Sequence, residues 1–179
     1  MPSTIGDLYL EDVRRQFHGQ KKLAEKALAQ VNDEQFFEKL DSESNSLALI
    51  VKHIAGNARS RWTDFWNSDG EKPARRRDSE FELESGDSRS SLMERWEEGY
   101  RSLFEIVDPM GPADLDRTIF IRAEPHSVVM AINRQLAHYA YHVGQIVFLA
   151  KHFAGSRWQS LSVPKGKSEE FNARMREKA

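Results

Sequence analysis

The chain has 179 residues, of which 39% are hydrophobic, and this length and composition suit one globular domain over residues 1–179. Its 26 basic and 28 acidic side chains give a net charge of −2, which argues against a dedicated nucleic-acid-binding protein. The absence of cysteine excludes disulfide bonds, thiolate metal sites and a cysteine nucleophile.

The sequence also argues against export and against insertion in a membrane. Its first residues lack the basic and then apolar pattern of a signal peptide. The longest apolar runs, such as residues 47–51, fall far short of the roughly 18 residues that span a bilayer. We therefore expect a cytoplasmic protein with no membrane partner.

Hydrophobic periodicity in the first half of the chain predicts two long helices. The first apolar stripe begins after a capping pattern and predicts a helix over residues 4–31. Ser46 is a suitable N-cap for a second helix, which we expect to end near residue 66, where polar residues and Gly70 follow. The charged segment from Glu71 to Gly86 contains a proline, and it predicts a long loop.

Two more long helices are expected in the second half, over residues 88–107 and 127–153. Between them, residues 118–122 alternate and favour a strand, but no partner strand is obvious. A short helix is expected near residues 169–176. Four long helices without repeats predict an all-α fold, an antiparallel four-helix bundle with a long loop between helices two and three.

Three histidines are candidate metal ligands. His138 and His142 lie four residues apart, so their Cβ atoms share a helix face about 5–6 Å apart, within reach of one ion at bonds of about 2.0–2.1 Å. His53 lies between Ile50 and Ile54 on the second helix and is directed toward the core. Because bundle helices lie about 8–10 Å apart, His53 can be a third ligand. A hydrogen-bonded core histidine is the alternative interpretation.

Two metal chemistries are excluded by the residues present. A carboxylate di-iron bundle needs Glu-x-x-His pairs, and the sequence has none. The metalloprotease motif needs Glu directly after its first histidine, where this chain has Tyr139. A three-histidine site with an open position remains, which is typical of catalytic zinc.

Longer stretches of the sequence carry a resemblance to a known family. The segments GNARSRWTDFWNSDGEKPARRRDSEFE, IRAEPHSVVMAINRQLAHYAYHVGQIVFLAKH and WQSLSVPKGKSEEFN resemble a bacterial subgroup of the DinB superfamily of four-helix metalloproteins. The resemblance implies a DinB-type bundle, in many members a homodimer, and a divalent ion, zinc or nickel. The positions that match the ligands of that ion are His53, His138 and His142.

The resemblance also suggests activities. Known members include transferases that use a low-molecular-weight thiol, so we expect thiol transfer to a small electrophilic substrate. One alternative is a metal-dependent hydrolase, with Asp64 or an acid of the long loop as the base. Another is a non-catalytic, stress-related protein with a structural metal.

Residues near the triad are assigned supporting roles. Gln145, three residues after the second histidine of the pair, can orient an imidazole or a water molecule. Asn57 shares the helix face of His53, and Arg61 can bind a substrate carboxylate through two hydrogen bonds. We expect His126 to cap the fourth helix and Tyr141 to point away from the site.

Overall fold

The computed structural model describes residues 3–177, and this part of the chain is mostly helical. Its α-helices are α1 (Ile5–Leu28), α2 (Asp33–Phe37), α3 (Leu47–Trp62), α4 (Arg89–Val107), α5 (Val128–Ala154) and α6 (Ser168–Arg176). Its two strands are β1 (Thr118–Ile121) and β2 (Glu124–Ser127). Short 3-10 helices are η1 (Arg77–Phe81), η2 (Pro112–Asp114) and η3 (Gly155–Arg157).

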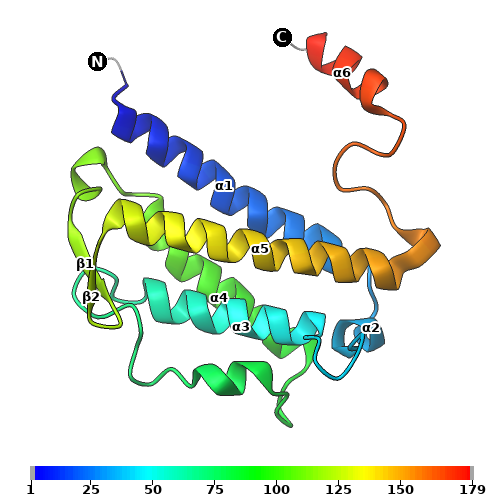
Figure 1. Cartoon of the computed structure of the whole chain (residues 1–179), viewed down its shortest axis with the longest axis horizontal. Helices are drawn as coiled ribbons and strands as arrows, with labels where there is room; N and C mark the ends of the chain where they lie inside the picture. Colours follow the sequence, from blue (N-terminus) through cyan, green and yellow to red (C-terminus); the bar gives the residue numbers. More distant parts are fainter. Residues whose placement is uncertain (1–2, 178–179) are drawn as a thin grey trace.

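The four long helices pack side by side around one core. α1 packs along α5, α3 packs along α4, and α3 also contacts α5. In Figure 1, α5 crosses the middle of the view. The segment between α3 and α4 returns along α3, where η1 packs on it. α6 stands apart from the other helices (Figure 1). The seam between α3 and α5 therefore lies beside the segment that carries η1.

The first helix is shorter than predicted. It ends at Leu28 instead of residue 31, because Asn32 caps α2. The Asn32 side chain accepts a hydrogen bond from the backbone N–H of Gln35, and the Gln35 side chain accepts one from the backbone N–H of Asn32. This capping box starts a new helix in another direction.

The end of α3 also differs from the prediction of residue 66. Thr63 is extended, and Asp64 has a φ of 47°, which no right-handed helix allows. Helices α4 and α5 begin after the N-caps Ser88 and Ser127, within one residue of the predicted starts. The expectation that His126 caps the last long helix is wrong, because Ser127 accepts the capping bond from the Met130 N–H.

The strand-forming segment near residue 118 has a partner that the sequence did not reveal. β1 and β2 form an antiparallel hairpin in which Phe120 pairs with Pro125 and Ile119 with His126. Its two-residue tip is Arg122-Ala123, which lacks the Asn-Gly or Asp-Gly pattern that usually marks such turns. A proline in β2 further weakened the strand pattern.

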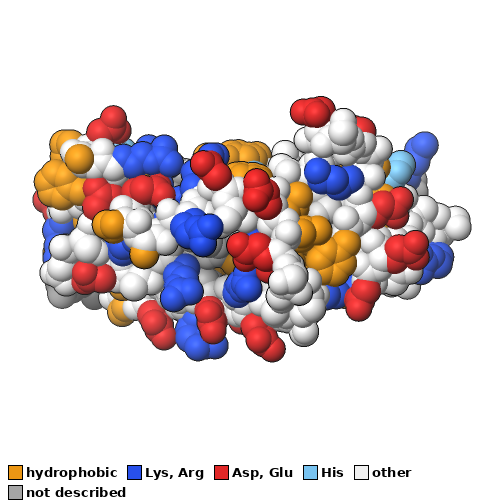
Figure 2. Space-filling model, turned by 90° about the horizontal axis from the view of Figure 1, so that it is seen from below, with side chains coloured by type: hydrophobic (Ala, Val, Ile, Leu, Met, Phe, Trp, Pro, Cys, Tyr) orange, Lys and Arg blue, Asp and Glu red, His pale blue; other side chains and the backbone are white. Residues whose placement is uncertain are grey.

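The predicted apolar stripes form the core. Phe17, Trp62, Trp96, Tyr100 and Tyr139 are its largest fully buried side chains. On the face that carries the segment between α3 and α4, basic and acidic side chains are interspersed (Figure 2). None of the helices described over residues 3–177 combines the length and the apolar character that crossing a bilayer requires.

Candidate metal centre

The three predicted histidines meet at the seam between α3 and α5. His53 is 3% exposed on α3, and His142 is 8% exposed on α5, with His138 half-buried one turn earlier. The pairwise distances between their ring centroids are 4.8 to 5.2 Å, and each pair of rings meets edge to face. The three imidazoles therefore surround a common point rather than stack.

The spacing of the nitrogen atoms suits a shared ion. One ligand nitrogen from each ring lies within 4.8 Å of the other two. The Nε2 atoms of His53 and His138 are 3.2 Å apart. Two nitrogens bound to one tetrahedral zinc at about 2.0–2.1 Å lie about 3.3 Å apart. The same 3.2 Å separation also suits a hydrogen bond between the two rings, but such a bond does not involve the third histidine.

A buried carboxylate fixes the orientation of His53. Oε2 of Glu80, on η1, lies 2.8 Å from Nδ1 of His53. A carboxylate accepts, so Nδ1 carries the hydrogen, and in the neutral imidazole Nε2 then holds the lone pair that a metal needs. Arg75 holds the same carboxylate with two hydrogen bonds of 2.8 Å, from Nε and Nη2. Phe81 covers the His53 ring from one side, with 4.7 Å between ring centroids.

The approach of Glu80 depends on a glycine of α3. A Cβ atom at Gly56 would overlap Oε1 of Glu80. Gly56 lies one turn after His53 and leaves room for the loop carboxylate beside the imidazole. An acid of the long loop was expected only as a base, and no spacing rule could have paired Glu80 with His53.

Gln145 and Tyr141 flank His142. Oε1 of Gln145 lies 2.8 Å from Nδ1 of His142, so the amide oxygen accepts from that nitrogen and leaves Nε2 free. This is the supporting position predicted for Gln145. The prediction that Tyr141 points away from the site is wrong. The centroid of its ring lies 4.3 Å from that of His142 and 5.3 Å from that of His138.

The electrostatics keep two of the histidines neutral. Burial, together with the neighbouring imidazoles, lowers the pKa of His138 to about 3. Burial likewise lowers the pKa of His142 to about 4, against the opposing effect of its bond to Gln145. Burial alone would raise the pKa of Glu80, but hydrogen bonds from His53 and Arg75 outweigh it and lower that pKa. Metal binding needs imidazoles that are neutral, and an ionised carboxylate beside them supports it.

A cavity of about 460 Å³ extends from the triad along the same seam. Asn57 and Arg61, both predicted, line it from α3, and Gln135 lines it from α5. All three are at least 96% buried, and Oδ1 of Asn57, Nε and Nη1 of Arg61 and Oε1 of Gln135 lack hydrogen-bond partners among the described residues. Buried polar atoms are normally paired, so these atoms can accept hydrogen bonds from, or donate them to, water or a molecule in the cavity.

The hairpin tip reaches the far end of this cavity. Arg122 and Ala123 both have positive φ, at 56° and 61°, a strained conformation for residues other than glycine. The carboxylate of Asp69 accepts their backbone N–H groups at 2.8 and 2.7 Å, and it also accepts the N–H of Glu71 at 2.7 Å. Asp69 thereby holds the turn that places Arg122 beside the cavity.

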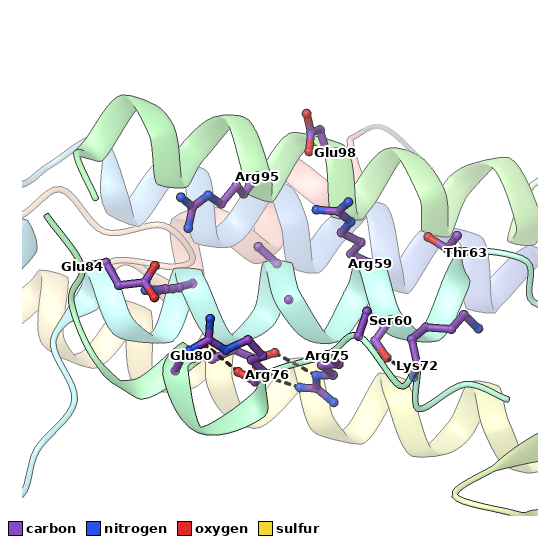
Figure 3. Close-up of a pocket in the computed structure, with 15 residues that line it drawn as sticks. Arg59, Ser60, Thr63, Lys72, Arg75, Arg76, Glu80, Glu84, Arg95 and Glu98 are labelled. Carbon is purple, nitrogen blue, oxygen red and sulfur yellow. Dashed lines mark hydrogen bonds and ion pairs between the residues drawn. The ribbon is translucent and has the colours of Figure 1, made fainter. Parts of the chain in front are cut away.

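A second hollow lies on the other side of Glu80, between α3, α4 and the loop (Figure 3). Basic residues such as Arg59 and Arg95 line it together with acidic ones such as Glu84 and Glu98. No histidine of residues 3–177 lines it, and its charges are mixed. Asp64, the other acid considered as a base, is exposed and bonds to Asn67, so the histidine cavity is the stronger candidate site.

Comparison with known proteins gives a family. Our search of curated proteins found no match to the chain. A family model described as "Protein of unknown function (DUF1572)" matches residues 4–167. Since this match includes all three histidines and most of the sequence, the chain belongs to the DUF1572 family.

Proposed function

We propose that this chain is a DinB-like metalloenzyme, built on a DinB-type four-helix bundle, that transfers a thiol to a small electrophilic molecule. His53, His138 and His142 would hold its divalent ion, zinc or nickel. The observation that carries the proposal is the convergence of three imidazole nitrogens within 4.8 Å. Hydrogen bonds from Nδ1 of His53 and His142 to Glu80 and Gln145 support it, because such bonds orient ligating histidines.

The lining of the cavity favours thiol chemistry. A bound divalent ion supplies a Lewis acid that keeps a coordinating thiol ionised without a protein base. The lining side chains include no Asp or Glu among the described residues, and arginines provide a positive environment for an anionic sulfur. The chain has no cysteine, so the thiol would come from a small cosubstrate.

Metal-dependent hydrolysis is the second candidate, and it has less support. It needs a base near the attacking water. The Glu80 carboxylate is held by both Arg75 and His53, and Asp64 is exposed. Three protein ligands with an open position also suit catalysis better than a structural metal, the third candidate. The homodimer and the cytoplasmic location stay predictions.

Elemental analysis tests the metal site. We expect about one equivalent of zinc or nickel in the wild-type protein and little in His142→Ala. His152→Ala is the matched control, because His152 is an exposed histidine on the same helix. Equal, sub-stoichiometric metal in all three proteins would refute the proposal.

Turnover separates the candidate reactions. The metal-loaded protein is incubated with a bacillithiol-type thiol and a test electrophile, and separately with hydrolysable esters and amides. Thiol-dependent consumption of the electrophile, lost in His142→Ala, is expected. Loss of fold on chelation, without turnover of any compound, would support the structural alternative instead.

A further inference from the structure

The cavity beside the triad has two chemically different ends. His53, Asn57 and Arg61 follow one another at intervals of four on α3, so they lie in one row on one face. At 1.5 Å per residue, the first and last Cα atoms of this row are about 12 Å apart along the helix. Gln135 lies one turn before His138 on the facing helix. The cavity therefore runs from the histidines at one end to Arg61 and the hairpin tip at the other.

The end away from the histidines holds a charged side chain with unused donors. Arg61 is 4% exposed, and among the described residues only its Nη2 atom has a partner, Oε2 of Glu71 at 3.2 Å. The same carboxylate is shared with Arg75 and Arg122, at 3.2 Å each. Burial, with repulsion from the neighbouring arginines, lowers the pKa of Arg61. A buried guanidinium that shares its one counter-ion is costly unless something else binds it.

The charges around the cavity are not balanced. Five arginines line it: Arg61, Arg75, Arg77, Arg122 and Arg134. Three carboxylates pair with them: Glu71, Glu80 and Asp78. Arg134 makes no ion pair within residues 3–177, although it is on the cavity wall. The surplus is positive, and a divalent cation at the triad would increase it, so the complementary ligand is an anion.

The middle of the cavity offers acceptors. Oδ1 of Asn57 and Oε1 of Gln135 are buried and lack partners among the described residues. A site with such unpaired oxygens favours a ligand that also carries an N–H or O–H donor, because leaving them unpaired costs free energy.

We propose that this cavity selects a small ligand with an acidic group, carboxylate or phosphoryl, that binds Arg61 and Arg134. The donor of that ligand bonds to Asn57 and Gln135, and its reacting end faces the histidines. Only this last orientation rests on the proposed function, since the anion site itself consists of residues outside the triad.

Binding of two probe anions tests the inference. Glycerate and glycerol 3-phosphate, which both carry hydroxyl donors and differ in the acidic group, are titrated into the protein as purified, at low salt, by calorimetry, with neutral butanediol for comparison. We expect at least one of the two anions to bind saturably. The anion with the higher affinity shows whether the cavity prefers a carboxylate or a phosphoryl group. Arg134→Gln and Arg61→Met should each weaken its binding at least tenfold. Arg59→Gln is the matched control, because Arg59 is on the same helix but lines the other hollow.

Metal analysis of the same samples keeps the two proposals apart. The arginine variants should retain the wild-type metal content, and His142→Ala should lose metal while still binding the anion. Arg134 is exposed, so its variant should fold. Undiminished anion affinity in both arginine variants, or no saturable binding of either probe to the wild type, would overturn the inference whatever the metal content.

Discussion

Glu80 lies 2.8 Å from Nδ1 of His53, although 27 positions separate the two residues in the chain. The contact joins the long segment between α3 and α4 to the candidate metal centre. It gives that segment a role that its charged composition did not suggest. The carboxylate positions the imidazole, and Arg75 positions the carboxylate.

Removing the charge of Glu80 should weaken metal binding. In Glu80→Gln, the amide keeps the shape but no longer holds His53 and Arg75 as an ionised acceptor. We expect a loss of about 10–100-fold in zinc affinity, the usual effect of altering such a partner. Competition with a chromophoric chelator measures it, with exposed Glu82→Gln as the control. Equal affinities in the two variants would contradict the role of Glu80.

A methyl group at Gly56 should also disturb the contact between Glu80 and His53. Gly56→Ala would push Glu80 away from His53, because the added Cβ overlaps the carboxylate. We expect weaker zinc binding and lower stability. Gly144→Ala is the control, since a Cβ there meets nothing within 4 Å, and it should stabilise α5 by about 0.5–1 kcal/mol. The prediction is wrong if both alanines stabilise the protein.

Metal should stabilise the folded protein. An ion that binds only the native state at 100 times its Kd adds about 2.7 kcal/mol, which raises Tm by several degrees. Thermal denaturation with zinc or nickel, and after chelation, measures the shift. His138→Ala should show none of it, and a shift of equal size in that variant would place the ion elsewhere.

Asp69 should contribute stability that depends on pH. Burial raises its pKa, but the backbone N–H groups of Ala123, Glu71 and Arg122 outweigh this effect and lower the pKa below 3.8. Between the folded and unfolded pKa values, the unfolded chain binds more protons, so this contribution is complete above about pH 3.8 and is lost as pH falls through the folded value.

The variant Asp69→Ala tests this dependence. It removes the acceptor of three backbone N–H groups, two of which water can reach, so we expect a cost of about 1 kcal/mol at neutral pH. Urea unfolding at pH 7 and near pH 3 should show the difference from wild type shrinking at acid pH. Asp78→Ala, at a fully exposed side chain, should be neutral throughout. A constant difference at both pH values would rule out the carboxylate as its source.

The sequence predicted what depends on helical periodicity. The starts of α3, α4 and α5, the common face of His138 and His142, and the position of Gln145 follow from local spacing and capping. The hairpin was missed because its Arg-Ala tip adopts positive φ only with the help of Asp69, more than 50 positions away.

The missing parts of the site have the same explanation. Glu80 reaches His53 through the path of an irregular segment, which no pattern encodes. Tyr141 was assigned by its helical angle alone, yet a ring beside a seam can still cover its neighbours on α5. Sequence reasoning therefore found the contact between two periodic helices at His53 and His138, and it missed the contacts made by irregular segments.

The turn held by Asp69 has a consequence for the proposed anion site. The histidines stand on two long helices, whose shape is constrained by the core, whereas Arg122 stands on a surface turn secured by a single carboxylate. Surface turns tolerate substitution and changes of length far better than packed helices do. Changes to the hairpin would therefore alter the proposed anion site while leaving the histidine triad in place.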